Sequence, residues 1–280
     1  MRHKVLLVVF GIATFSTGLF AQADICIGKE DTVYSHVLQE ERKYWIHLPE
    51  NYADSVQKHY PVIYLLDGDL FFHALVAVQR SYSRGRQPVM PECIIVGILN
   101  TNRTRDYTPS KSAYRRDGKR YAGDKEVGGG SESFTVYLRD ELRKKIDKTY
   151  RTNNFNIIIG HSFGGLFVMN TLLLHSELFN IYVALDPSFW WDNGKLQKDA
   201  DKLFDTKQFN QIKLYLAIAA KTRPEVNNIH LNTADDFINK TLPKGIKNGL
   251  NVEYKIFPDE SHGTIPIPGM ANALKGILDL

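Results

Sequence analysis

Short continuous apolar runs, separated by amphipathic segments, recur along this chain. Such runs are typical of strands that are buried on both faces of a parallel sheet. We predict strands of this kind at 61–66, 93–98, 156–159, 182–185, 213–219 and 252–257. Nearer the start of the chain, polar and apolar residues alternate over 33–38 and 44–48, which predicts an antiparallel pair.

Apolar residues at helical spacing occupy several of the segments between these strands. The clearest stripe runs from Phe134 to Ile146 at every fourth position, with Ser131 and Ser133 before it as N-cap candidates. Further helices are predicted at 164–174, 194–204, 233–247 and 270–278. Alternating strands and helices predict an α/β protein: a doubly wound, mostly parallel sheet with helices on both faces, in one domain.

One segment, residues 100–130, shows no clear periodicity and is rich in Arg, Lys, Tyr, Gly and Ser. A loop of this length in a compact domain is usually functional or mobile. Because it follows a predicted strand, it should emerge at the carboxyl edge of the sheet, where α/β proteins bind their ligands.

The composition excludes several classes of protein. The chain has 280 residues, of which 43% are hydrophobic and 24% charged, which is ordinary for a soluble globular protein. The net charge of +4 is too small and too dispersed to indicate a nucleic-acid partner. Cys26 and Cys93 are too few for a disulfide framework or a four-cysteine zinc site, and they form either one disulfide or two separate buried thiols.

Residues 1–23 have the pattern of a signal peptide. Arg2 and Lys4 precede an apolar stretch over 5–20, and Ala21-Gln22-Ala23 offers small residues at a cleavage position. A membrane anchor is the alternative, but the stretch is short and diluted by Gly, Ser and Thr. We therefore expect bacterial export to the periplasm or medium, a mature domain at 24–280 and no stable membrane insertion after cleavage.

The sequence Gly160-His161-Ser162-Phe163-Gly164 lies between a predicted buried strand and a predicted helix. It matches G-x-S-x-G in the strand–turn–helix context that a nucleophile elbow requires. A sharp turn projects the serine hydroxyl above the sheet, and the adjacent helix N-terminus favours negative charge there. Ser162 is therefore the predicted nucleophile.

A serine nucleophile needs a base, an orienting acid and an oxyanion hole. His262 is the predicted base because it follows the last strand and precedes the last helix. Glu225 is the predicted acid, as the first carboxylate after the 213–219 strand. The alternatives are Asp235, Asp236, Asp259, Glu260 or a Ser-His dyad. The predicted oxyanion donors are the backbone N–H groups of Phe163 and Asp69.

Six segments together resemble the putative-esterase branch of the α/β-hydrolases, especially its siderophore-esterase-like members. These segments are YPVIYLLDGD (60–69), VGILNTNRTRDYTP (96–109), the glycine run at 128–130, GHSFGGLF (160–167), DPSFWWDNG (186–194) and ESHGT (260–264). The resemblance implies a serine esterase without metal or organic cofactor, with Ser162 and His262 as catalytic residues. Two features depart from it: Asp186 stands where a small residue is expected, and residues 222–224 give no simple acid motif.

The substrate is less closely defined by the sequence. Arg103 and Arg105 belong to a basic, tyrosine-rich cluster that suits an anionic or catechol-bearing ester. Trp190, Trp191 and His161 are the other predicted substrate-binding residues. A siderophore ester, a feruloyl or acetyl ester on a glycan, and acyl transfer to a second alcohol all remain open. So does a catalytically silent binding module on the same fold.

Overall fold

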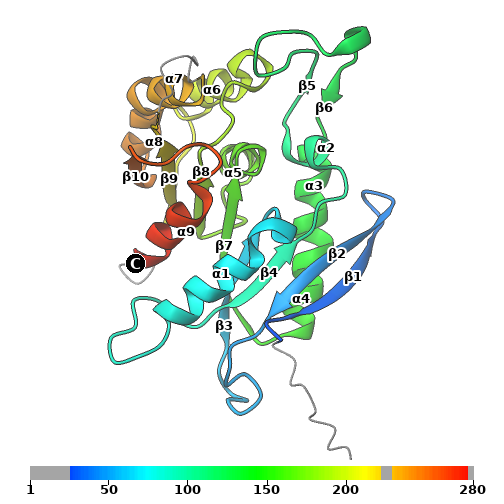
Figure 1. The fold of residues 1–280 in the computed structure, drawn as a ribbon, viewed down its shortest axis with the longest axis vertical. Helices are drawn as coiled ribbons and strands as arrows, with labels where there is room; N and C mark the ends of the chain where they lie inside the picture. The colour runs from blue at the N-terminus through cyan, green and yellow to red at the C-terminus, as the bar shows by residue number, and fades with distance from the viewer. Residues whose placement is uncertain (1–25, 222–228, 277–280) are drawn as a thin grey trace, which may run out of the picture.

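The computed structural model describes residues 26–221 and 229–276, and Figure 1 shows a central sheet with helices on both of its faces. The strands of the sheet are β1 (Lys29–Ser35), β2 (Glu40–His47), β3 (Tyr60–Leu65), β4 (Ile94–Ile98), β7 (Thr152–His161), β8 (Ile181–Leu185), β9 (Lys213–Ala219) and β10 (Asn251–Phe257). The α-helices are α1 (Gly68–Tyr82), α2 (Arg103–Tyr107), α3 (Ser131–Tyr137), α4 (Arg143–Thr149), α5 (Phe163–Leu174), α6 (Trp191–Leu203), α7 (Ile229–Asp236), α8 (Leu242–Lys247) and α9 (Pro266–Lys275). The remaining elements are the 3₁₀ helix η1 (Ala122–Asp124), the π-helical segments η2 (Leu138–Leu142) and η3 (Phe237–Thr241), and the short strands β5 (Lys111–Ser112) and β6 (Val127–Gly128).

The strands follow the order β1-β2-β4-β3-β7-β8-β9-β10 across the sheet. β2 is antiparallel to both β1 and β4, whereas all later pairs are parallel. The carboxyl ends of β3, β7, β8, β9 and β10 therefore lie along one edge of the sheet, which is where α/β sheets place their sites.

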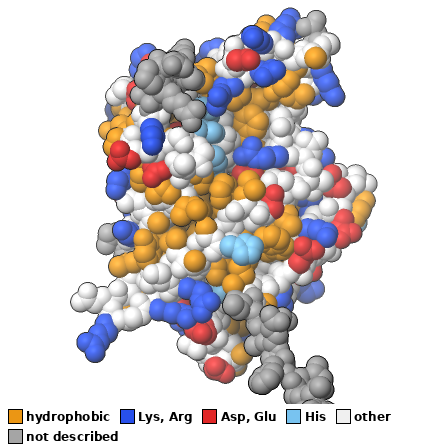
Figure 2. Space-filling view, viewed as in Figure 1, with side chains coloured by type: hydrophobic (Ala, Val, Ile, Leu, Met, Phe, Trp, Pro, Cys, Tyr) orange, Lys and Arg blue, Asp and Glu red, His pale blue; other side chains and the backbone are white. Residues whose placement is uncertain are grey.

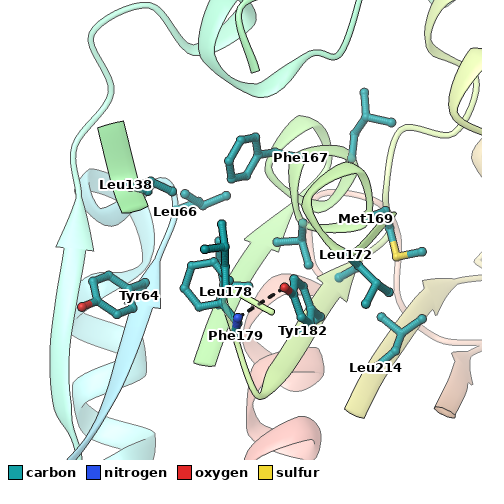
Figure 3. Close-up of a cluster of buried hydrophobic side chains, with 14 of the residues drawn as sticks. Tyr64, Leu66, Leu138, Phe167, Met169, Leu172, Leu178, Phe179, Tyr182 and Leu214 are labelled. Carbon is teal, nitrogen blue, oxygen red and sulfur yellow. Dashed lines mark hydrogen bonds between the residues drawn. The ribbon is translucent and has the colours of Figure 1, made fainter. Parts of the chain in front are cut away.

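Both faces of the sheet are covered by apolar layers. Successive side chains of a strand point to opposite faces, so in β3 Val62 and Tyr64 join one buried cluster while Ile63 and Leu65 join the other. The first cluster includes side chains of α3, α4 and α5, and Figure 3 shows part of it around Phe167. The second lies under α1 and α9, which Figure 1 shows in front of the sheet.

The predicted strands and helices are present, with ends that differ by a few residues. The strand predicted at 156–159 is longer and runs from Thr152 to His161. Helix α1 is not among the predicted elements, because apolar residues also occupy its outer side and blur the helical stripe. Leu70, in its first turn, is 65% exposed. The irregular segment 100–130 contains only α2, η1 and the β5–β6 ladder, and it leaves β4 at its carboxyl end as predicted.

This strand order with helices on both faces is the α/β-hydrolase fold that the sequence predicts. Within 26–221 and 229–276, no helix has the length and apolar character needed to cross a bilayer. Cys26 and Cys93 are free thiols, the first exposed and the second buried, so neither sequence alternative for this pair is correct. The predicted signal peptide, residues 1–23, lies outside the described residues.

Candidate active site

Ser162 occupies a sharp turn between β7 and α5. Its φ and ψ of 59° and −114° fall in a region that residues other than glycine rarely adopt. The turn is crowded, because a Cβ on Gly160 would lie 2.4 Å from backbone atoms of Gly164. A 3.0 Å hydrogen bond from the Ser162 N–H to the Leu185 carbonyl ties the turn to the end of β8. The turn therefore presents the Ser162 hydroxyl at the carboxyl edge of the sheet.

His262 lies in the loop between β10 and α9, and it contacts Ser162 as predicted. Its Nε2 is 3.0 Å from Ser162 Oγ, and its Nδ1 is 2.6 Å from Oδ2 of Asp186. Because a carboxylate only accepts, Nδ1 carries the proton and Nε2 is left to accept from the serine hydroxyl. This is the geometry of a nucleophile, a base and the acid that orients the base.

Asp186 therefore replaces the predicted acid. Glu225 lies outside the described residues, and the structure shows the Nδ1 of His262 already bonded to Asp186. The same contact corrects the alternatives Asp235, Asp236, Asp259 and Glu260, and that of a Ser-His dyad. These alternatives do not engage Nδ1 in the described part of the chain.

The backbone explains how Asp186 takes this place. Asp186 directly follows β8, has a φ of 42° and is 1% exposed. Its Oδ1 accepts the N–H of Ala219, the last residue of β9, at 3.1 Å. The carboxylate thus lies at the end of β9, after which the sequence predicts the acid. Asp186 itself, however, follows the preceding strand, β8. An aspartate at the carboxyl end of a buried apolar strand was the available signal.

His161 packs against the ring of His262, with their centroids 4.6 Å apart. It donates its Nε2–H to the backbone carbonyl of His262 at 2.8 Å. Burial and the nearby charge of His262 lower the pKa of His161 to about 4, so its imidazole is neutral at physiological pH. Through these contacts His161 supports the His262 loop, while the prediction that it binds substrate stays a prediction.

His230, in the first turn of α7, also packs against His262 and was not predicted in the site. Its ring centroid lies 4.0 Å from that of His262, and the residue is 4% exposed. Its Nε2 accepts the indole N–H of Trp190 at 3.2 Å. Burial, the charge of His262 and the charge of Arg116 lower the pKa of His230 to about 3.

The starts of α1 and α5 lie side by side next to Ser162. A Cβ on Gly164 would be 3.3 Å from Oδ2 of Asp67, the residue before α1. The N–H groups of a helix's first turn have no intrahelical acceptor, and they form the positive end of its dipole. Phe163 opens α5 and Asp69 is the second residue of α1, so both predicted oxyanion donors lie in these two first turns.

Arg103, which the sequence predicts to bind substrate, connects the start of α1 to the end of β7. Its guanidinium donates two hydrogen bonds to the Asp67 carboxylate, at 2.6 and 2.9 Å, and a third to the His161 carbonyl at 3.1 Å. Asp67 is fully buried and has a φ of 54°. Arg103 therefore tethers the start of α1 to the residue that precedes Ser162, and with its side chain 31% exposed its predicted role in substrate binding stays a prediction.

Arg105 is also paired within the protein. It donates to Glu40 on β2 at 3.1 Å and to Asp106 at 2.7 Å. Asp106 accepts in turn from the buried Arg42 at 2.8 Å. The guanidinium of Arg105 thus belongs to an ion-pair network that joins α2 to the sheet, and its predicted role in substrate binding stays a prediction.

Trp190 and Trp191 have different environments. Trp190 is half-buried, and its ring lies 5.8 Å from that of Phe163 and against His230, so it borders the site. Trp191 is 1% exposed and donates its indole N–H to the Ser110 carbonyl at 3.0 Å. Trp191 is therefore a core residue, which corrects the prediction that it binds substrate.

Residues 111–128, the basic hairpin, extend from β5 to β6 at the top of Figure 1. Figure 2 shows Lys and Arg side chains gathered in this region. The basic residues of the hairpin, against three acidic ones, are Lys111, Arg115, Arg116, Lys119, Arg120 and Lys125. A Cβ on Gly128 would lie 2.9 Å from the ring of Trp191, and that ring is 5.0 Å from the ring of Phe163, so the base of the hairpin adjoins the Ser162 turn.

Asp186, His230 and His262 offer ligand atoms within 4.8 Å of one another, the spacing of a possible metal site within the described residues. Asp186 and His262 are bonded to each other, however. The bond from Trp190 requires the proton of neutral His230 to be on Nδ1, which leaves that atom no lone pair for a metal. The nitrogen and oxygen atoms of these three residues are therefore arranged for the hydrogen bonds described above, and not for a metal ion.

Residues 35–244 match the model of a family described as Putative esterase. The crystal structure of an IroE-like serine hydrolase from Shewanella oneidensis has a TM-score of 0.84 and 34% sequence identity, covering 90% of this chain and 80% of that one. The ferri-bacillibactin esterase BesA of Bacillus subtilis is 28% identical over 239 residues, 80% of each chain. The siderophore enterobactin esterase of Emericella nidulans is 22% identical over 258 residues, 81% of this chain and 85% of that one.

The family model spans most of the chain, and the relatives match it over a similar length. The Ser162 turn, the α/β-hydrolase sheet and the histidine loop all lie where the resemblance places them. This chain belongs to the Putative esterase family of the α/β-hydrolases, in its siderophore-esterase-like branch.

Proposed function

We propose that this protein is an exported serine esterase that hydrolyses the ester bonds of siderophores. The observation that carries the proposal is the hydrogen-bonded array from Ser162 through His262 to Asp186. Relatives named as siderophore esterases support the choice of substrate. The signal-like pattern of residues 1–23 supports export.

The reaction follows from the positions of the protons. Ser162 Oγ attacks the ester carbonyl carbon while its proton passes to Nε2 of His262, and Asp186 stabilises the resulting imidazolium. The negative charge on the carbonyl oxygen is stabilised by the N–H groups of Phe163 and Asp69. His262 then protonates the leaving alcohol as its bond to carbon breaks. Water, deprotonated by His262, releases the acid from Ser162 by the reverse sequence.

The surroundings of the array suit a large anionic ester. A ferric catecholate complex is a polyanion with aromatic faces, and it would meet the positive charge of the basic hairpin, residues 111–128. Trp190 and Phe163, whose ring centroids are 5.8 Å apart, offer aromatic rings next to the serine. Arg116 is an exposed residue of the hairpin, and its charge helps to lower the pKa of His230, the residue that packs against His262.

The direct test is ester hydrolysis by the purified mature protein. Its intact mass, measured by mass spectrometry, should equal that of a chain that starts at Asp24. The substrates are a ferric catecholate trilactone, its iron-free form, methyl ferulate and a neutral p-nitrophenyl ester. We expect chromatography to show linear products from the trilactone, with a higher kcat/KM than for the other esters. A folded protein that cleaves none of them would contradict the proposal and favour a binding module.

Arg116→Gln should weaken binding of the ferric substrate without harming the chemistry. We expect KM for the ferric trilactone to rise about 3- to 10-fold, with kcat nearly unchanged, because one partly screened charge contributes little more than this. Steady-state kinetics at two salt concentrations measure the effect, which should shrink at high salt.

Lys148→Gln is the matched control, because it removes one exposed positive charge from α4, outside the basic hairpin. Neither variant should alter KM for the neutral p-nitrophenyl ester. Equal rises of KM in the two variants would show that total charge, and not the hairpin, governs binding.

A further inference from the structure

The bonds within the array leave one motion of His262 unrestrained. Its hydrogen bonds to Ser162 and Asp186 both lie at the edges of the imidazole ring. Two edge contacts define where the ring nitrogens point, but they do not prevent the ring from tilting about the line that joins them. The side chain is also 31% exposed and is carried by a loop, so the plane of its ring depends on the rings packed against it, which are His161 at 4.6 Å between centroids and His230 at the shorter distance of 4.0 Å.

His230 supplies a contact on the face of that ring. The two imidazoles are 4.0 Å apart between centroids, with 35° between their planes. The His230 side chain is only 5% exposed, and it comes from α7, a different element from the loop that carries His262. A tilt of His262 toward α7 would therefore bring the two rings into collision.

The orientation of His230 is itself determined. Indole N–H is only a donor, so Nε2 of His230 must accept from Trp190. The proton of the neutral ring is then on Nδ1, which has no hydrogen-bond partner within the described residues and lies 3.9 Å from Oδ2 of Asp186. At that distance it forms no hydrogen bond and does not compete with His262 for the carboxylate.

Burial and the titratable groups around His230 keep it neutral. These groups are Asp186 after β8, His262 in the β10–α9 loop, His161 at the end of β7 and Arg116 in the basic hairpin. Burial and the positive charge of Arg116, and of His262 when it is protonated, outweigh the opposing effect of Asp186 and lower the pKa of His230 to about 3. The face of a neutral aromatic ring attracts a cation, whereas a second imidazolium would repel the one that forms on His262 during the reaction.

We propose that His230 is a positioning residue for the proposed esterase reaction, and that it acts through its ring face. It holds the plane of His262 in line with Ser162 and Asp186, and it lies against the imidazolium that His262 becomes when it accepts the serine proton. The inference rests on the proposed function, because it requires Ser162 to be the nucleophile and His262 the base. His230 touches neither the substrate nor the proton that moves.

Three substitutions of His230 distinguish the contribution of its ring face to kcat from that of its nitrogen atoms. His230→Ala removes the ring, and we expect kcat to fall about 10- to 100-fold with KM nearly unchanged, as for other small displacements of a catalytic group. His230→Phe keeps a ring face without either nitrogen and should return kcat to within about threefold of the wild type. His230→Asn keeps an N–H donor without a ring and should be as slow as His230→Ala.

The measurements are steady-state kinetics on a neutral p-nitrophenyl ester and the rate at which a fluorophosphonate labels Ser162. His175→Ala is the control, since His175 ends α5 beside Glu132 and not beside His262. Circular dichroism and melting temperature establish which variants are folded. If His230→Ala does not fold, the comparison of His230→Phe with His230→Asn decides the question.

Rescue of kcat and of the labelling rate by His230→Phe, and not by His230→Asn, supports the inference. A kcat within twofold of wild type in folded His230→Ala overturns it, and so does a folded His230→Phe that is no faster than His230→Asn. Failure of the wild-type protein to be labelled at Ser162 contradicts the proposed function itself. Normal labelling of the wild type with no effect of the His230 variants contradicts the His230 inference alone.

Discussion

Ser162→Ala is expected to abolish ester hydrolysis, with a loss of about 10⁶-fold in kcat and no change of fold. The side chain supplies the oxygen that His262 activates at 3.0 Å, and alanine leaves His262 with nothing to deprotonate at that position. The backbone of the turn is held by the Leu185 carbonyl and by glycines, which the substitution does not touch. Turnover of the ferric trilactone and fluorophosphonate labelling should both disappear, while the melting temperature is retained.

Ser188→Ala is the matched control for this variant. The Ser188 hydroxyl lies 3.2 Å from Ser162 Oγ and is 1% exposed, so it is the serine best placed to substitute as a nucleophile. We expect mass spectrometry to find the label on Ser162 in both the wild type and Ser188→Ala. Label on Ser188, or activity that survives in Ser162→Ala, would show that Ser162 is not the nucleophile.

Asp186→Asn is expected to lower kcat by about 10⁴-fold, the loss seen when the orienting acid of a triad is made neutral. The loss of activity follows from the hydrogen bond that the Asp186 side chain accepts from Ala219. Ala219 N–H needs an acceptor, so the amide oxygen of the new asparagine would take the place of Oδ1 and turn its NH₂ toward His262. His262 Nδ1 would then have to accept, which moves its proton to Nε2 and prevents it from deprotonating Ser162.

Glu225→Gln is the control for this result, since Glu225 was the acid favoured by the sequence. We expect it to keep kcat within about twofold of the wild type, as is usual for substitutions outside a catalytic array. Steady-state kinetics on the neutral p-nitrophenyl ester compare the two variants without the contribution of the basic hairpin. A loss in Glu225→Gln as large as that in Asp186→Asn would contradict the assignment of the acid.

The parts of the site that the sequence predicts correctly depend on local patterns. The Ser162 turn is encoded by glycines at fixed offsets between a buried strand and a helix. His262 follows from the chain order of the motif and from its loop after the last strand. The sheet follows from apolar runs that are buried on both faces, as in β3. In each case the sequence pattern lies within a few residues of the structural feature that it predicts.

The parts that the sequence misses depend on contacts between distant segments. The carboxylate of Asp186 reaches the end of the neighbouring strand because of a left-handed backbone conformation that its position in the chain does not reveal. Arg103 looks like a residue for an anionic ligand until its partner, Asp67, 36 positions earlier, is known. His230 is the second residue of α7 and belongs to no catalytic motif, so only its packing on His262 singles it out.

Arg103 and the basic hairpin are close in sequence but have different structural roles. Arg103 begins α2 and holds the starts of α1 and α5 together, whereas the basic hairpin starts only at Lys111. We therefore expect changes of charge within the exposed part of the hairpin, residues 115–120, to leave the hydrogen bonds of Arg103 to Asp67 and His161 in place. A protein built in this way can acquire new substrates by remodelling its hairpin while the machinery that breaks the ester bond stays the same.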